Sequence, residues 1–207
     1  MLDRPWTEAP LCALDLEGTG AQDKDNEAIL EVAAIPIVDG SPDLSSAYES
    51  LVNPGRAVPR RRWISPGLTD EVLREAPSPA QVGRELGERV SGRYLVGHNI
   101  GVDWRLLRLH YPDLRPLGLV DTLRLVRASQ PKGPKGLGAL LDRFELREQV
   151  DKSVPSGRPH RALWDTVAAA VLLARLVEDD PSIHTLGDLV SAASVPLGPP
   201  EEDPTLF

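Results

Sequence analysis

The chain has 207 residues, which is enough for one domain with a core of ordinary size. Its formal net charge of −8 argues against a protein whose whole surface grips polyanions. The sequence shows no secretory leader pattern and no apolar run near the roughly 20 residues that span a bilayer, so we expect a soluble, cytoplasmic protein with no membrane contact. Cys12 is the single cysteine, and its place in an apolar segment predicts a buried core residue.

The first predicted element is a buried strand within LCALDLEGTG, residues 11–20. Side chains two positions apart on a strand point the same way, so Asp15 and Glu17 project together. Like charges at that spacing repel. We therefore expect either a cation between the two carboxylates or a proton on one of them.

Two more strands are predicted at residues 27–40 and 45–54, with a turn at residues 39–42 between them. Their short connections indicate an antiparallel start to the sheet. A helix beginning near Pro79 carries an apolar stripe of Val82, Leu86 and Val90. A short buried strand at 93–97 precedes a helical pattern at 100–111, which Pro112 stops.

The second half of the chain continues this alternation. Residues 117–123 are a further strand candidate, 129–136 a Pro/Gly/Lys loop, and 138–146 a helix. The segment 162–177 is apolar nearly all round, which is typical of a helix buried on most faces, and a last helix is expected after Pro181. We predict an α/β fold with a mixed sheet flanked by helices, divided into an N-terminal extension (1–9), a domain (10–194) and a flexible tail (195–207).

Further carboxylates fall where a structural role is hard to find. Asp103 shares a helix face with Leu106 and Leu107, and Asp165 lies inside the apolar helix. An unpaired buried charge is costly, and no lysine or arginine offers an obvious partner for all four carboxylates. Hard oxygen ligands in this number suit Mg²⁺ or Mn²⁺ better than Zn²⁺.

Three segments in this order, DLEGTG, GHNIGVD and HRALWD, resemble the motifs of DnaQ-like 3′–5′ exonucleases of the DEDDh type, which include proofreading subunits of bacterial replicative polymerases. The similarity extends over roughly residues 10 to 178 and includes ISPGLTDEVL and LVDTLRL. It implies a ribonuclease H-like fold and a two-ion site of Mg²⁺ or Mn²⁺. The residues that it makes catalytic are Asp15, Glu17, Asp103, His160 and Asp165, of which the four carboxylates are the metal ligands. It also places Leu16, Thr19 and Thr69 near the terminal nucleotide. Many relatives have threonine where this chain has Gly18.

The resemblance suggests a mechanism. Asp15 would be shared by two ions, Glu17 and Asp165 would complete one site, and Asp103 would help to hold the other. His160 and Asp165 are five residues apart and would not share a face of one helix, whereas Pro159 indicates that His160 precedes the helix, where it can act as general base. The products would be 5′-mononucleotides, released from the 3′ end of single-stranded DNA in proofreading or repair.

Other interpretations stay open. The same chemistry on RNA or very short oligonucleotides is the nearest alternative, and the acidic net charge favours short substrates. The terminal DPTLF is similar to bacterial clamp-binding peptides without their usual glutamine, so a module that binds a polymerase or sliding clamp through its tail is another. Arg60–Arg62 and the lysines of the 129–136 loop are either solvated or in contact with nucleic acid. Asn99 is a candidate N-cap. The oligomeric state is not indicated.

Overall fold

The computed structural model describes residues 1–129 and 132–198 and has a seven-stranded mixed sheet at its centre. The strands are β1 (Leu11–Gly18), β2 (Ile29–Val38), β3 (Ser41–Pro42), β4 (Tyr48–Leu51), β5 (Tyr94–Gly97), β6 (Gly118–Asp121) and β7 (Ser194–Val195). They follow the order β3-β2-β1-β5-β6-β7, and β4 also pairs with β2. Strands β1, β5 and β6 are parallel, whereas the other pairs are antiparallel. The predicted antiparallel start and mixed sheet are confirmed.

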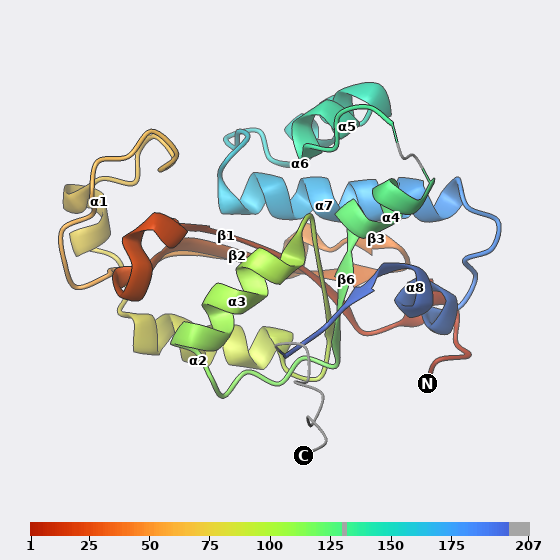
Figure 1. Cartoon of the computed structure of the whole chain (residues 1–207), viewed down its shortest axis with the longest axis horizontal. Helices are drawn as coiled ribbons and strands as arrows, with labels where there is room; N and C mark the ends of the chain where they lie inside the picture. The colour runs from red at the N-terminus through yellow and green to blue at the C-terminus, as the bar shows by residue number, and fades with distance from the viewer. Residues whose placement is uncertain (130–131, 199–207) are drawn as a thin grey trace, which may run out of the picture.

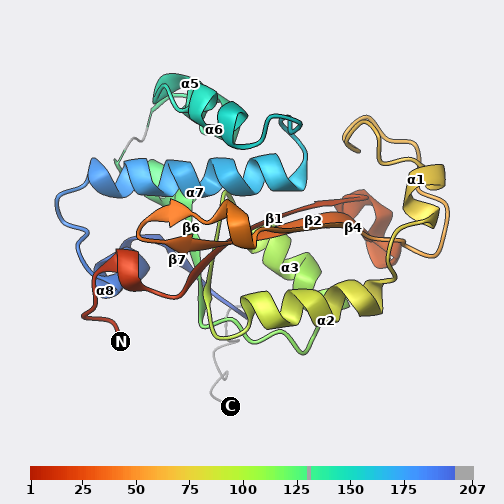
Figure 2. The ribbon, with the colours of Figure 1, turned by 180° about the vertical axis from the view of Figure 1, so that it is seen from behind.

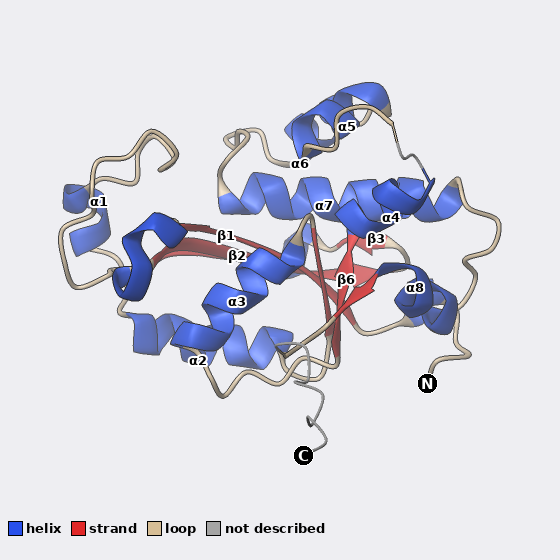
Figure 3. Ribbon diagram, in the orientation of Figure 1, coloured by secondary structure: helices blue, strands red, loops and turns tan. Residues whose placement is uncertain are grey.

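Helices cover both faces of this sheet, as Figure 1 and Figure 3 show. The α-helices are α1 (Asp70–Arg74), α2 (Pro79–Val90), α3 (Ile100–His110), α4 (Thr122–Ser129), α5 (Leu137–Arg143), α6 (Arg147–Ser153), α7 (Ala162–Glu178) and α8 (Leu186–Ala193), of which α1 lies beyond one end of the sheet (Figure 1). The long helix α7 lies along one face with α5 and α6 outside it, and α2 and α3 lie on the other face (Figure 2). No helix among the described residues has the length and apolar character needed to cross a membrane.

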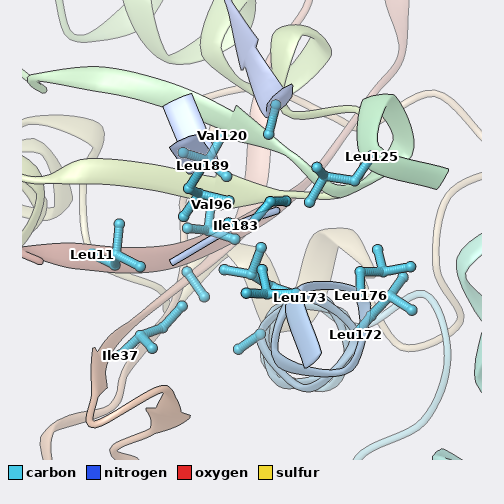
Figure 4. Packing of buried hydrophobic residues seen from close by; sticks show 14 of the residues in the cluster. Leu11, Ile37, Val96, Val120, Leu125, Leu172, Leu173, Leu176, Ile183 and Leu189 are labelled. Atoms are coloured by element: carbon cyan, nitrogen blue, oxygen red, sulfur yellow. The ribbon is translucent and has the colours of Figure 1, made fainter. Parts of the chain in front are cut away.

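The alternation of side chains along β1 divides the core into two parts. Leu11 and Ala13 point toward α7, and Figure 4 shows Leu11 across from Leu172 and Leu173 of that helix. Cys12 and Leu14 point to the opposite face, where they join the cluster beneath α2 and α3. The predicted burial of Cys12 is thus correct. By the same alternation, Asp15 and Glu17 continue the row that faces α7.

Three helices, α1, α4 and α6, were not indicated by the sequence pattern. Helices α1 and α6 have only 5 and 7 residues, too few to display a clear period. The strand expected at 117–123 ends instead at Asp121, and α4 begins at once. The reason is local: the Asp121 carboxylate accepts a hydrogen bond of 2.9 Å from the Leu123 backbone N–H, which turns the chain into a helix.

Both ends of the described chain are tied to the domain. Near the N-terminus, Trp6 N donates to His184 O (3.2 Å) and Gly187 N donates to Leu2 O (2.8 Å), so the predicted extension is held against the start of α8. At the other end, Val195 pairs with Leu119 of β6, and the Leu197 carbonyl accepts from the Trp104 indole at 2.6 Å. Residues 195–198 therefore belong to the folded domain rather than to a flexible tail. The DPTLF segment lies outside the described residues.

Candidate active site

The carboxyl end of β1 meets the start of α7 at a cluster of acidic side chains. Asp15 and Glu17 lie on the face of β1 that α7 covers, and Asp165 lies in the first turn of α7. One ligand atom each from Glu17, His160 and Asp165 lies within 4.8 Å of the other two. These three side chains come from two separate sequence segments, and tertiary packing brings them together.

Asp103 approaches the same strand end from α3. Its side chain is buried, with 8% exposed, and its Oδ1 accepts a long hydrogen bond of 3.4 Å from the Leu16 backbone N–H. The bond therefore joins Asp103 to Leu16, the residue that separates Asp15 from Glu17 in β1. The carboxyl groups of Asp103 and Asp15 are also close enough for each to perturb its neighbours electrostatically.

His160 stands before α7, as the sequence pattern predicted, and both ends of its backbone are held. Its φ angle is +64°, a left-handed conformation that costs a non-glycine residue of order 1–3 kcal/mol. Its N–H donates to Asp165 Oδ2 at 2.9 Å, and its carbonyl accepts from the Ser65 hydroxyl. The residue itself is exposed. The backbone is thus fixed while the imidazole remains open to solvent and to a ligand.

The cluster carries more negative charge than its surroundings compensate. Burial raises the pKa of Glu17 to about 7 and the pKa of Asp165 to about 6. Burial likewise raises the pKa of Asp103 to about 8. The pKa of Asp15 is raised well above its ordinary value, by burial first and then by the charges of its acidic neighbours. A group of carboxyls whose ionisation is opposed in this way favours a bound cation.

Glu31 is a buried acid of this region that the sequence analysis missed. It lies on β2 directly opposite Glu17, with 0% exposed, and the guanidinium of Arg161 binds it through Nε and Nη2 at 2.5 to 3.0 Å. Its Oε2 also accepts from Ala162 N at 3.3 Å. Arg161 therefore compensates Glu31 and joins β2 to the first residue of α7. A single charge inside the apolar run ILEVAAI was a signal that could have identified Glu31.

Ser65 is the second residue that was missed. Its side chain comes from the long connection between β4 and α1, and its Oγ lies 2.9 Å from Glu17 Oε2 while also donating to the His160 carbonyl. Arg158 donates to the Pro66 carbonyl beside it. The connection is thus tied at two points to the segment that carries His160. No sequence signal distinguishes Ser65, because the contact depends on how two distant loops meet.

The three residues expected near the terminal nucleotide occupy different environments. Leu16 is partly buried and packs toward α2 and α3, away from the face of Asp15 and Glu17. The Thr19 side chain is 1% exposed and its Oγ1 accepts from Ala28 N at 3.0 Å, so it stabilises its own loop. Thr69 is exposed and caps α1 by accepting from Val72 N at 3.4 Å.

Two further positions have local explanations. At Gly18, where the pairing register of β1 with β2 shifts, an added Cβ would lie 3.0 Å from the carbonyl oxygen of Ala28, the residue just before β2. Threonine at this position would require the neighbouring backbone to move. Asn99 is the N-cap residue of α3, as predicted, but its backbone is left-handed and its side chain makes no capping hydrogen bond. Its backbone N–H donates instead to Asp121 Oδ1 at 2.8 Å.

Comparison with known proteins identifies the class. A model of the exonuclease family matches residues 12–173, so the chain belongs to that family. The predicted membership among DnaQ-like 3′–5′ exonucleases is confirmed at this level. Among curated relatives, a DNA polymerase III subunit epsilon-like protein of Rhodobacter capsulatus is 29% identical over 177 residues, covering 86% of this chain. The PolC-type DNA polymerase III of Bacillus subtilis is 28% identical over 178 residues, covering 83% of this chain. The chain spans only 25% and 12% of these two relatives.

Solved structures agree on the fold. Exonuclease X in complex with 5′ overhanging duplex DNA superimposes with a TM-score of 0.63 at 25% identity, covering 82% of this chain and 92% of that one. The nuclease domain of 3′hExo, a DEDDh family member bound to rAMP, gives a TM-score of 0.58 at 16% identity and covers 84% and 94%. The predicted ribonuclease H-like fold class is confirmed.

Proposed function

We propose that the protein hydrolyses the terminal phosphodiester bond at the 3′ end of single-stranded DNA and releases 5′-mononucleotides. The observation that carries this proposal is the convergence of Glu17, His160 and Asp165 within 4.8 Å beside Asp15. Membership of the exonuclease family supports the reaction class. The names of the curated relatives, which are polymerase proteins, support DNA as the substrate and proofreading or repair as the setting.

The donor set fits divalent metal ions. The four carboxylates offer hard oxygen ligands, and the nearby guanidinium of Arg161 is already committed to Glu31. The residues that would hold two ions of Mg²⁺ or Mn²⁺ are Asp15, Glu17, Asp103 and Asp165. When bound, the ions would make a water molecule more acidic and neutralise charge on the phosphate group.

Other side chains of the protein have roles in proton transfer and in positioning the acidic residues. His160 is exposed next to the acidic cluster, so its imidazole can accept the proton of the attacking water. The backbone bonds to Asp165 and Ser65 hold the His160 backbone beside the acidic cluster, so its imidazole would lie near a phosphate bound there. Ser65 orients the Glu17 carboxylate through its hydroxyl, and Glu31 with Arg161 anchors the start of α7, which carries Asp165.

One experiment tests both the proposed activity and the preference for DNA or RNA. We would follow 5′-labelled single strands of matched DNA and RNA sequence with Mg²⁺, Mn²⁺ or EDTA, comparing wild type with His160→Ala. His184→Ala is the matched control, because His184 is an exposed histidine at the far end of the molecule near Trp6. A metal-dependent ladder that shortens from the 3′ end and is lost only in His160→Ala supports the proposal. If neither strand shortens with any metal, the proposal is wrong for long strands, and dinucleotides are tested next.

Binding of a polymerase or sliding clamp through residues 195–207 is a separate proposal. It depends on the DPTLF segment and has no support from the described residues. Clamp captured by the full chain and lost on deletion of residues 199–207 would support it. No capture by the full chain would dismiss it.

A further inference from the structure

The connection between β4 and α1 carries a concentration of positive charge next to the acidic cluster. We refer to residues 53–69 as the arm. Arg60, Arg61 and Arg62 are consecutive in it and exposed, although the chain as a whole has a net charge of −8. Among the described residues, none forms an ion pair with any of these three arginines. Their guanidinium groups are therefore available to an external anion.

An exposed aromatic ring follows these arginines directly. Trp63 is 48% exposed and is the one aromatic residue among the large, exposed hydrophobic side chains of the described chain. The Arg61 guanidinium lies over the ring, 5.7 Å from its centroid. This arrangement occupies one face of the indole, and the exposure of the residue leaves ring surface for a second planar group.

The edge of the indole is fixed to the loop that follows the acidic strand. Trp63 Nε1–H donates to the Thr19 carbonyl at 3.0 Å. A Cβ at position 20 would lie 2.7 Å from the same nitrogen, and Gly20 has a φ of +86°, so the contact requires glycine there. The indole is thus bonded to the backbone of Thr19, the second residue after Glu17, and its position does not depend on the arm alone.

The arm also touches the catalytic cluster itself. Ser65 contacts both Glu17 and the carbonyl of His160. Two residues of chain span at most about 7 Å, so the backbone of Trp63 lies within that distance of Ser65. A nucleotide adjoining the one at the reacting phosphate can therefore reach the indole.

We propose that Trp63 and Arg60–Arg62 form a binding subsite for single-stranded nucleic acid upstream of the terminal nucleotide. The indole stacks on a base, and the arginines contact the phosphates of the same strand segment. This combination of an aromatic platform with cationic side chains is how proteins hold single strands without reading their sequence. The inference rests on the proposed exonuclease function and names the part of the substrate that the arm holds.

The test compares a substrate that reaches the subsite with one that does not. The long substrate is a 5′-labelled DNA octamer, and the short one is the p-nitrophenyl ester of thymidine 5′-monophosphate, both with Mg²⁺. We expect Trp63→Leu to raise KM for the octamer about tenfold more than KM for the ester, within the range measured for one stacked base. Trp63→Phe, which keeps a ring, restores most of the octamer affinity.

The arginines are tested through salt. Replacing all three by glutamine lowers the slope of log KM against log salt for the octamer by about 2, if each arginine meets one phosphate of a single strand. Arg84→Gln on α2 and Leu109→Ala on α3 are control variants, because both side chains are exposed outside the arm. Neither control changes the octamer KM.

A binding measurement separates this inference from the proposed function. Anisotropy of the labelled octamer with Mg²⁺ is followed in a His160→Ala background, in which the strand stays intact, with and without Trp63→Leu. If the wild type hydrolyses neither substrate, the function is wrong, whereas octamer binding that depends on Trp63 still supports the subsite. Equal losses for octamer and ester, no loss for either, or binding unaffected by Trp63→Leu would overturn it.

Discussion

The ion pair between Arg161 and Glu31 holds the start of α7 against the sheet, and its removal makes a quantitative prediction. Glu31 has no exposed side-chain area, whereas the Arg161 side chain is 28% exposed. Leaving one partner of a buried pair unpaired costs about 3–5 kcal/mol. Because Arg161 is partly exposed, water can reach Glu31 when the guanidinium is removed, so we expect Arg161→Ala to lower the free energy of unfolding by about 3 kcal/mol. For a chain of this length, that is a decrease in Tm of about 6–12 °C.

Urea unfolding followed by circular dichroism in EDTA measures this loss. Lys152→Ala is the control. Lys152 forms an ion pair with Glu148, and because their side chains are 74% and 80% exposed, the pair should contribute less than about 1 kcal/mol to the free energy of unfolding. The double variant Glu31→Gln/Arg161→Ala should be more stable than Arg161→Ala alone, since a neutral amide is less costly to bury than an unpaired carboxylate. An Arg161→Ala protein within about 1 kcal/mol of wild type, or strictly additive losses, would refute the reasoning.

Three other predictions concern the cluster itself. Asp15→Asn should abolish turnover yet make the metal-free protein more stable at high pH, because it removes a buried carboxyl whose ionisation burial and the acidic neighbours oppose; hydrolysis by a clean preparation would contradict its role. Burial raises the pKa of Glu17 from 4.5 to about 7, so its stabilising contribution is full below pH 4.5 and is lost as pH rises through 7. In EDTA, the Tm of the wild type should therefore fall as the pH rises from 4.5 to about 7, and the Tm of Glu17→Gln should fall less. A rise in the Tm of the wild type over this range would contradict the prediction. Ser65→Ala should lower kcat for the mononucleotide ester about tenfold with little change in KM, because it releases the His160 carbonyl; an effect on KM alone would exclude positioning.

Much of the fold followed from local pattern. Period-2 alternation along β1 predicted that Cys12 is buried and that Asp15 and Glu17 share a face, and the structure agrees. The apolar character of residues 162–177 likewise predicted the central helix α7. These predictions succeed because strand and helix periods are properties of the backbone. The short helices α1 and α6 were not predicted, because they contain too few residues for a helical period to appear in the sequence.

The sequence by itself picked out the acids that we propose to bear the chemistry, because they lie in apolar segments where no neighbouring residue compensates their charge. It also placed His160 outside the helix, because proline precedes it. Only the tertiary structure decided which groups surround those acids. Glu31 meets Arg161 across 130 residues of chain, Ser65 meets His160 across 95, and Trp63 reaches Thr19 across 44. Such contacts depend on how the sheet, α7 and the arm pack together, so they cannot be predicted from the spacing of residues within one segment.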